Sequence, residues 1–292
     1  MDSNIVIIFD SIPYFKDRFK DRGAKIYSTF RKLNFFDKVL LRLANYFKVG
    51  FLYKFLYDKW IEHLTDAKVF LVFATKNIHH LEYIRKHNPS ARIILWYWNP
   101  VEACYDISKI DKTLCEKWSF DPQDCKNFGI QFNTTFYFNE IKAVAPKCEY
   151  DLFFLGLDKG RELKLKMIEE DFSRRGVRPY FYIVKPKDKD ARSVTYVEYL
   201  SYLAKSKAVF DFVQEGQMGL TVRVMESLFL DKKLVTTNKD IRRYDFYRPD
   251  NIFILGEDNP EALLEFINSP YLEVDKEIVA KYDVANWIAR FF

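Results

Sequence analysis

The stretch that most constrains the fold is residues 209–238, VFDFVQEGQMGLTVRVMESLFLDKKLVTTN. It begins with a short apolar run bounded by charge, which predicts a buried strand at 209–213. A loop with two glycines follows, and residues 221–230 then carry apolar side chains at helical spacing. Two lysines end this helix before a second apolar run at 234–237. Strand, glycine-bearing loop, helix and strand in this order predict a parallel α/β unit.

Such a loop places backbone N–H groups and a helix N-terminus at the carboxyl edge of the sheet, where phosphates bind. Arg223 and Glu226 lie three residues apart, so we predict that the arginine pairs with a phosphate and the carboxylate accepts both hydroxyls of a ribose. The alternative for each is an ordinary surface ion pair. We predict that Thr221 caps the helix, either as a plain cap or with its N–H and hydroxyl facing the phosphates. Gly216 and Gly219 either admit a ligand close to the backbone or simply mark turns.

The same alternation of apolar runs and helical patterns extends over the whole chain. Its 292 residues suit two domains of roughly 150 residues each. We predict two doubly wound, Rossmann-like α/β domains at residues 1–145 and 146–275, joined near Pro146. Residues 276–292 have a helical pattern with apolar positions, and we expect them to pack back on the first domain. Strands are predicted at 4–9, 69–73, 92–97, 150–155, 179–184, 209–213, 234–237 and 252–255, with strand-like pieces near 118 and at 134–138.

Composition narrows the class of protein. The formal net charge of +5 suits an anionic ligand, and it is too small to indicate a nucleic-acid partner. The four cysteines form no CxxC pair and only four histidines are present, which argues against a structural zinc site. The opening residues MDSNIVIIFDS lack a basic region, and no apolar run approaches the length of a membrane span. We therefore expect a cytoplasmic protein with reduced thiols.

Residues 15–60 are rich in lysine, arginine and aromatic side chains. The pattern is mostly helical, with Gly23 and Gly50 as interruptions. One interpretation is a solvated helical face on which lysine stems cover apolar surface. The other is a surface for anionic lipid head groups or a lipid-linked acceptor, which places the protein peripherally at the inner face of the plasma membrane.

Three segments look like motifs of one enzyme family. WSFDPQDCKNFGIQF, at 118–132, looks like the FDxxD segment before the interdomain linker of bacterial polysaccharide transferases. DLFFLGLDKGREL, at 151–163, looks like the first strand and phosphate loop of a donor domain. GLTVRVMESLFLDKKLVTTN, at 219–238, looks like the donor-binding helix with its RxxE element. In this order they resemble nucleotide-sugar glycosyltransferases of the GT-B architecture, of the type that builds bacterial lipopolysaccharide, capsule and exopolysaccharide.

The resemblance implies two Rossmann-like domains facing across a cleft. It also implies a nucleotide-diphosphate sugar as donor, with uridine diphosphate as the favoured carrier, and a growing surface glycan or lipid-linked saccharide as acceptor. Retaining members often place two glutamates eight residues apart in this helix region, whereas here Met218 stands eight residues before Glu226. This departure favours an inverting transfer.

Two cations are candidates for neutralising the charge of the leaving diphosphate. Lys159 and Arg161 flank Gly160 in the predicted phosphate loop, where they either neutralise a leaving diphosphate or simply face solvent. In other transferases a divalent metal performs this task. No DxD carboxylate pair follows a strand here, so we predict that the protein needs no metal and no cofactor.

An inverting transfer also needs a base that takes the proton of the acceptor hydroxyl. Asp10 ends the first predicted strand and so lies at the carboxyl edge of its sheet. His79 and His80 open a helix after the second predicted strand, and Glu102 follows the third. These are the candidates for the base, and Asp10 has the alternative role of capping a turn with Ser11.

Two other classes of protein stay open. A nucleotide-sugar epimerase or hydrolase can use the same fold, but such a site needs several carboxylates and histidines, and the second half of the chain contains no histidine. A non-catalytic, nucleotide-sugar-binding partner of a polysaccharide assembly is the other alternative, and it would bind nucleotide without turnover.

Overall fold

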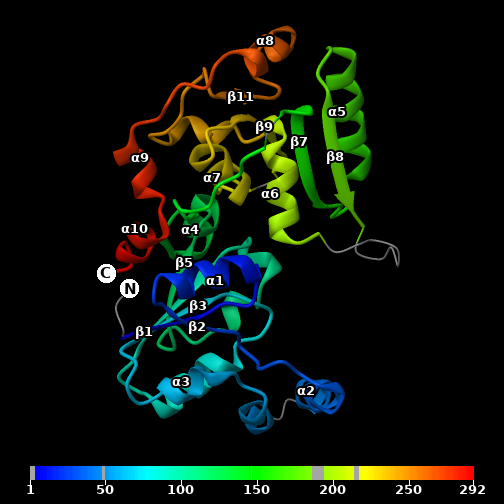
Figure 1. The fold of residues 1–292 in the computed structure, drawn as a ribbon. Helices are drawn as coiled ribbons and strands as arrows, with labels where there is room; N and C mark the ends of the chain where they lie inside the picture. The colour runs from blue at the N-terminus through cyan, green and yellow to red at the C-terminus, as the bar shows by residue number, and fades with distance from the viewer. Residues whose placement is uncertain (1–3, 48–49, 146, 186–193, 214–216) are drawn as a thin grey trace. The chain divides into compact units, whose positions relative to one another are not determined.

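The computed structural model describes residues 4–292 except 48–49, 146, 186–193 and 214–216. The chain divides into two compact units, Met1–Asn133 and Thr134–Phe292, hereafter the first and second unit. Each unit contains one parallel sheet flanked by helices (Figure 1). The boundary predicted near Pro146 falls on a residue outside the described part of the chain, and the contacts divide the chain before that point, after Asn133.

The first unit holds a six-stranded sheet in the order β2-β1-β3-β4-β5-β6, with every neighbouring pair parallel. Its central strands are apolar and buried along their length, as expected for a parallel sheet covered on both faces. The strands are β1 Ile5–Ile8, β2 Lys25–Tyr27, β3 Val69–Phe73, β4 Arg92–Tyr97, β5 Glu116–Ser119 and β6 Gln131–Phe132. The helices are α1 Pro13–Asp21, α2 Phe35–Phe47, α3 His79–His87 and α4 Pro122–Phe128, with short 3-10 turns η1 Gly50–Phe55, η2 Lys59–His63, η3 Val101–Ala103 and η4 Ile107–Lys109.

The second unit holds a five-stranded parallel sheet in the order β11-β10-β9-β7-β8. Its strands are β7 Tyr150–Leu157, β8 Pro179–Val184, β9 Ser206–Asp211, β10 Lys233–Thr236 and β11 Ile252–Ile254. Its helices are α5 Glu162–Arg174, α6 Tyr196–Ala204, α7 Val222–Phe229, α8 Leu263–Asn268, α9 Lys276–Lys281 and α10 Val284–Ala289, with η5 Lys239–Arg243 and η6 Pro260–Ala262.

Both sheets place their strands in the same spatial order. In each, the first strand lies between the second and the third, so the direction of winding reverses between β1 and β3 in the first unit and between β7 and β9 in the second. In an open parallel sheet, ligands bind outside the carboxyl ends of the strands at this reversal, the switch point. The topology therefore predicts one candidate site in each unit.

The segment 134–138, predicted as strand-like, belongs to the second unit instead of the sheet of the first. Tyr137 pairs with Asp283 in an isolated bridge, and the ring of Phe136 lies 4.2 Å from that of Trp287. The C-terminal helix of the prediction is two helices, because Asp283 breaks the pattern and caps α10 by accepting a hydrogen bond from the backbone of Ala285. The tail thus packs on residues 134–139, which the prediction had counted in the first domain.

None of the helices in the described part of the chain is both long and apolar enough to cross a membrane.

Candidate functional site

Two arginines meet beside Gly156, at the carboxyl end of β7 in the second unit. Arg223 donates from Nη2 to the carbonyl of Leu155 over 2.9 Å, and Arg161 donates from Nη1 to the carbonyl of Phe212 over 2.7 Å. A Cβ atom added to Gly156 would lie only 2.6 Å from Nη2 of Arg223. A side chain at this position would therefore shift the Arg223 guanidinium away from the end of the strand.

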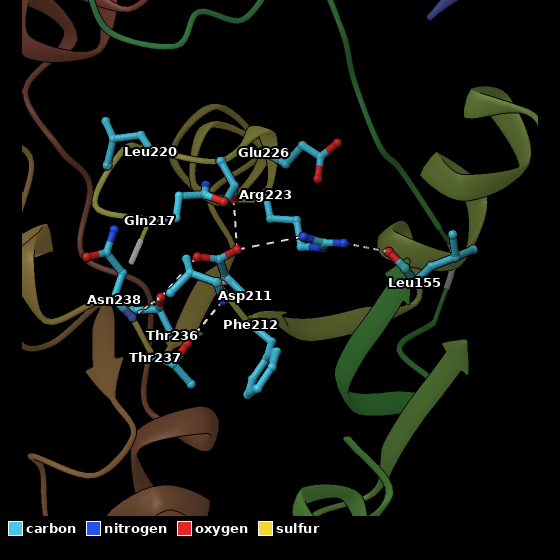
Figure 2. Close-up of polar contacts among 12 residues, drawn as sticks. Leu155, Asp211, Phe212, Gln217, Leu220, Arg223, Glu226, Thr236, Thr237 and Asn238 are labelled. Carbon is cyan, nitrogen blue, oxygen red and sulfur yellow. Dashed lines mark hydrogen bonds and ion pairs between the residues drawn. The ribbon is translucent and has the colours of Figure 1, made fainter. Parts of the chain in front are cut away.

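A buried carboxylate anchors one of these arginines. Asp211 is the last residue of β9, has no exposed surface, and forms an ion pair of 3.7 Å with Arg223. It accepts hydrogen bonds from the hydroxyls of Thr221 over 2.8 Å and Thr236 over 3.0 Å. Figure 2 shows Arg223 held between Asp211 and the carbonyl of Leu155. Both guanidinium positions are thus fixed by the protein before any ligand arrives.

Lys159 adds a third cation to this cluster. Burial lowers the pKa of Lys159, and the charges of Arg161 and Arg223 lower it further. Burial and the charge of Arg223 also lower the pKa of Arg161. These like charges are therefore close enough to repel one another, and Asp211 balances only part of them. We call Lys159, Arg161 and Arg223 the cation cluster.

The cation cluster is partly exposed to solvent. Arg223 keeps 18% of its side chain exposed, and its guanidinium lies 4.8 Å from the ring centre of Phe154. The Arg161 guanidinium lies 5.6 Å from the rings of Phe154 and Phe212. Rigid guanidinium groups on aromatic faces form a preorganised site for phosphate, which they bind through paired N–H donors. The site lies at the switch point of the second sheet.

Glu226 occupies a different environment from the one predicted. Only 1% of the residue is exposed, so the alternative of an ordinary surface ion pair is wrong for Glu226. Its two oxygens accept hydrogen bonds from Tyr196, over 2.6 Å, and from Tyr199. Burial raises its pKa from 4.5 to about 7. Figure 2 shows the carboxylate turned away from Asp211. Both of its oxygens already accept tyrosine hydroxyls, so a bound ribose would compete with the tyrosines for them. Ribose binding by Glu226 stays a prediction.

The two remaining predicted donor-site residues lie beside the cation cluster. Thr221 stands at the N-cap of α7, but its hydroxyl donates to Asp211 and makes no capping hydrogen bond. Gly219 is buried, and its carbonyl accepts from the side chain of Gln217 over 3.5 Å. Gly216 lies outside the described residues.

The first unit has a pocket of about 770 Å³ at its own switch point. Two of the predicted base candidates, Asp10 and His79, line it together, at the ends of β1 and after β3. The lining consists of Asp10, Thr29, Phe30, Asn45, Thr75, Lys76, Asn77, His79 and Tyr105. Aromatic rings, amide groups and hydroxyls of this kind suit a polyhydroxylated ligand, and the volume is that of a small-molecule site.

Asp10 and His79 are held in place by their neighbours. Asp10 accepts hydrogen bonds from the backbone N–H of Thr29 over 2.8 Å and from its hydroxyl over 2.5 Å. The carboxylate therefore bridges the ends of β1 and β2, and these contacts replace the predicted turn with Ser11. The His79 ring stacks on Tyr53 at 4.5 Å, and its Nδ1 lies 3.6 Å from Glu82.

The other two base candidates lie elsewhere. His80 is 1% exposed, and neither ring nitrogen has a hydrogen-bond partner among the described residues. Burial lowers its pKa to about 3, so it is a neutral member of the core. Glu102 is exposed on η3 and is not among the residues that line the pocket.

Sequence reasoning missed Asp211, Gly156 and the two tyrosines that hold Glu226. Asp211 had a signal, because a lone carboxylate stands inside the apolar run VFDFV. A charge in such a run needs a buried partner, and a second charge was available on the following helix. The contacts of Gly156 and the tyrosines depend on how strands and helices pack, which the sequence does not display.

Comparison with known proteins identifies the class of fold. No protein-family model matches the chain, and no curated protein matches it at a significant level. A DNA-modifying β-glucosyltransferase, solved with and without its substrate uridine diphosphoglucose, is 12% identical and gives a TM-score of 0.52, covering 98% of this chain and 97% of that chain. An α-glucosyltransferase in complex with UDP and a mismatched 13-mer DNA is 8% identical with a TM-score of 0.48, covering 98% and 89%.

At such identities the likeness concerns the fold alone. The two parallel sheets and the similarity to the β-glucosyltransferase give the chain the GT-B glycosyltransferase fold, which confirms the predicted fold class. The chain and that glucosyltransferase match over nearly their full lengths, so the likeness includes both units.

Proposed function

We propose that the protein is a glycosyltransferase that moves a sugar from a nucleotide-diphosphate sugar, a UDP-sugar by preference, to a saccharide hydroxyl. The observation that carries this proposal is the cation cluster at the switch point of the second sheet. A departing nucleoside diphosphate develops negative charge, and two anchored arginines with a neighbouring lysine stabilise that charge. The GT-B fold and the UDP-glucose substrate of the similar β-glucosyltransferase support the same donor class.

The arginines are suited to this role because their positions are set in advance. Arg161 and Arg223 are anchored to backbone carbonyls of Phe212 and Leu155, so little reorganisation is needed when charge develops. Cations of this kind perform the electrostatic task that a divalent metal performs in other transferases. We therefore propose a transfer that needs no metal, and the expected activity is unchanged after chelation.

We propose that the pocket of the first unit receives the acceptor. Asp10 takes the proton of an acceptor hydroxyl while that oxygen attacks the anomeric carbon of the donor. The bond from the anomeric carbon to the diphosphate breaks, the electron pair leaves with the diphosphate, and the configuration inverts. Thr29 holds the carboxylate through two hydrogen bonds, and His79 is the second candidate for the base in the same pocket.

The acceptor that we propose is a growing surface glycan or a lipid-linked saccharide of bacterial polysaccharide synthesis. The support is the resemblance of the FDxxD, phosphate-loop and RxxE segments to transferases of that type, together with the polar and aromatic lining of the pocket. The similar solved transferases act on or bind DNA, which makes a nucleic-acid acceptor the outcome against which this proposal is tested.

A thermal-shift screen against UDP, CDP, GDP and their glucose conjugates tests the donor assignment. A ligand that binds the folded state raises the melting temperature according to its concentration and affinity. We expect the largest shift with uridine nucleotides and its loss in Arg161→Gln. Lys164→Gln, which removes an exposed cation from the same helix α5 outside the cluster, is the matched control. If no nucleotide raises the melting temperature, the proposal is rejected. Nucleotide binding without sugar transfer to any acceptor would favour the non-catalytic alternative.

A further inference from the structure

One helix of the first unit presents its apolar side to solvent. In α2, only Asp37 and Ala44 are buried, whereas Phe36 is 79% and Tyr46 is 81% exposed. At 3.6 residues per turn, the exposed apolar positions of α2 fall within an arc of about 120°. The neighbouring turn η1 adds two more exposed rings. We call this set the aromatic face: Phe35, Phe36, Val39, Leu43, Tyr46 and Phe47 of α2 with Phe51 and Phe55 of η1.

The aromatic face coincides with the positive charge of the chain. Residues 31–59 contain seven lysines and arginines and two aspartates, which gives this stretch a net charge of +5. The whole chain also has a net charge of +5, so the remaining residues sum to zero. Lys38 and Arg42 lie on α2 beside the apolar arc and are exposed. A helix with an outward apolar face and flanking cations is the pattern that lies in the plane of an anionic lipid interface.

We propose that the aromatic face docks on an anionic lipid bilayer, with α2 lying in the interface. The aliphatic side chains of Val39 and Leu43 stand between the rings, and they insert into lipid but cannot stack on nucleic-acid bases. A second copy of the chain would bring two faces of equal positive charge together, which costs free energy. Charge complementarity therefore favours anionic lipid over either partner.

Helix α2 contributes to the wall of the pocket. Asn45 of α2 lines the pocket and accepts a hydrogen bond of 2.7 Å from the hydroxyl of Tyr53 in η1. Tyr53 in turn stacks on His79 of the pocket. α2 packs against η1, so the side of these elements opposite the aromatic face borders the pocket. This step rests on the proposed function: a pocket bordered by a bilayer-bound helix takes a saccharide carried on a lipid.

Vesicle sedimentation tests the inference. The full chain is mixed with vesicles of phosphatidylcholine alone or of an equimolar mixture with phosphatidylglycerol. We expect sedimentation with the anionic vesicles and release as salt rises, because salt screens the attraction. The double variant Phe36→Ser with Tyr46→Ser should lower the partition constant at least about tenfold, since two exposed rings no longer insert. Both side chains are exposed, so the fold should be retained.

The matched control is Leu163→Ser with Met167→Ser, which removes two apolar side chains of similar exposure, 79% and 68%, from α5 of the second unit. It should bind vesicles as the parent protein does. An equal loss in the control, equal binding to both vesicle types, or binding to neither would overturn the inference. Dimerisation of the parent, or its binding to a single-stranded oligonucleotide, without vesicle binding would overturn it in favour of the other partners.

Calorimetric titration with UDP, without lipid, separates this inference from the proposed function. The Phe36→Ser, Tyr46→Ser variant should bind UDP as the parent protein does, because the cation cluster belongs to the second unit. A protein that sediments with anionic vesicles but binds no UDP would keep the docking surface and reject the donor assignment. A protein that binds UDP but does not sediment with vesicles would keep the donor assignment and reject the docking surface.

Discussion

The two units use the same strand order for two different kinds of site. At the switch point of the first sheet, β1 and β3 leave a pocket of about 770 Å³ whose lining includes Asp10, Lys76 and His79 beside neutral groups. At the equivalent point of the second sheet, Arg161 and Arg223 pack around Gly156 with Asp211 beneath them. The fold therefore places a candidate site at the switch point of each sheet, and the residues at the strand ends give each site its charge.

The contrast in charge is the clearest difference between the two sites. The first carries an exposed carboxylate, suited to take a proton from a neutral saccharide. The second carries surplus positive charge, suited to an anion that leaves with an electron pair.

The largest expected effect is on transfer in Asp10→Asn. Removing a general base lowers the rate by about a hundredfold to ten-thousandfold, so we expect a loss of transfer in this range. UDP affinity should stay unchanged, because the substitution lies in the first unit. Rates of sugar transfer and calorimetric titration with UDP measure the two properties. A parallel loss of UDP affinity would contradict the division of labour between the sites.

Glu226 makes the stability of the chain depend on pH. Its pKa rises from 4.5 to about 7 on folding, so the folded state binds more protons than the unfolded state between these values. The contribution is most stabilising below about pH 4.5, falls as pH rises towards 7, and amounts to about 3 kcal/mol at most. Urea unfolding of the parent and of Glu226→Gln, compared over this range, should show a difference that changes with pH. A constant difference would mean that Glu226 keeps an ordinary pKa.

Glu226→Ala tests both the stability contribution of this carboxylate and its predicted role in binding ribose. It leaves the buried hydroxyl of Tyr199 without this acceptor, whereas the hydroxyl of Tyr196 keeps its hydrogen bond with Tyr137. An unpaired buried polar group costs about 1–3 kcal/mol. We therefore expect a destabilised second unit. UDP affinity measured well below the melting temperature then decides the ribose role: a tenfold loss in both Glu226→Ala and Glu226→Gln supports it, and unchanged affinity rejects it.

Gly156→Ala should weaken UDP binding by about tenfold. The new methyl group would lie 2.6 Å from Nη2 of Arg223, so the guanidinium must move away from the strand end. Gly50→Ala in the first unit is the control, because no atom lies within 4 Å of an added Cβ there. Titration with UDP compares the two variants, and equal affinities would show that the position of Arg223 does not matter.

The smallest expected effect belongs to Lys159. Lys159 is more exposed than either arginine, so water and salt screen more of its charge, and Lys159→Ala should weaken UDP binding by only about threefold. Raising the salt concentration in the titration should reduce even this difference. A loss of UDP affinity as large as that of Arg161→Gln would show that Lys159 contributes as much to UDP binding as the arginine does.

The fold was largely predictable from the sequence because the apolar strand runs are continuous and well separated. The predicted strands at 92–97 and 179–184 coincide with β4 and β8. The three-residue strand β2 was missed because it is too short to show a period of its own, and it lies inside a region predicted as mostly helical. The spatial order of the strands, which creates both switch points, depends on long-range pairing that no local pattern encodes.

The site was predictable only in part, for a similar reason. Helical spacing placed Arg223 and Glu226 near each other, but it could not show that Val224–Leu228 would all be buried, which turns Glu226 inwards. For residues 15–60, the surface feature was predictable and its orientation was not. The amphipathic pattern was visible, but only the packing of α2 on η1 shows that its apolar side faces outwards.

The central claim is that the cation cluster binds the diphosphate of a nucleotide donor. Calorimetric titration of uridine and UDP against the parent and Arg161→Gln, with Lys164→Gln as control, tests it most directly. We predict that the parent and the control bind UDP at least about tenfold more tightly than uridine, and that Arg161→Gln loses most of this preference while its uridine affinity is unchanged. Equal affinities of the parent for uridine and UDP, or an undiminished preference in Arg161→Gln, would contradict the account.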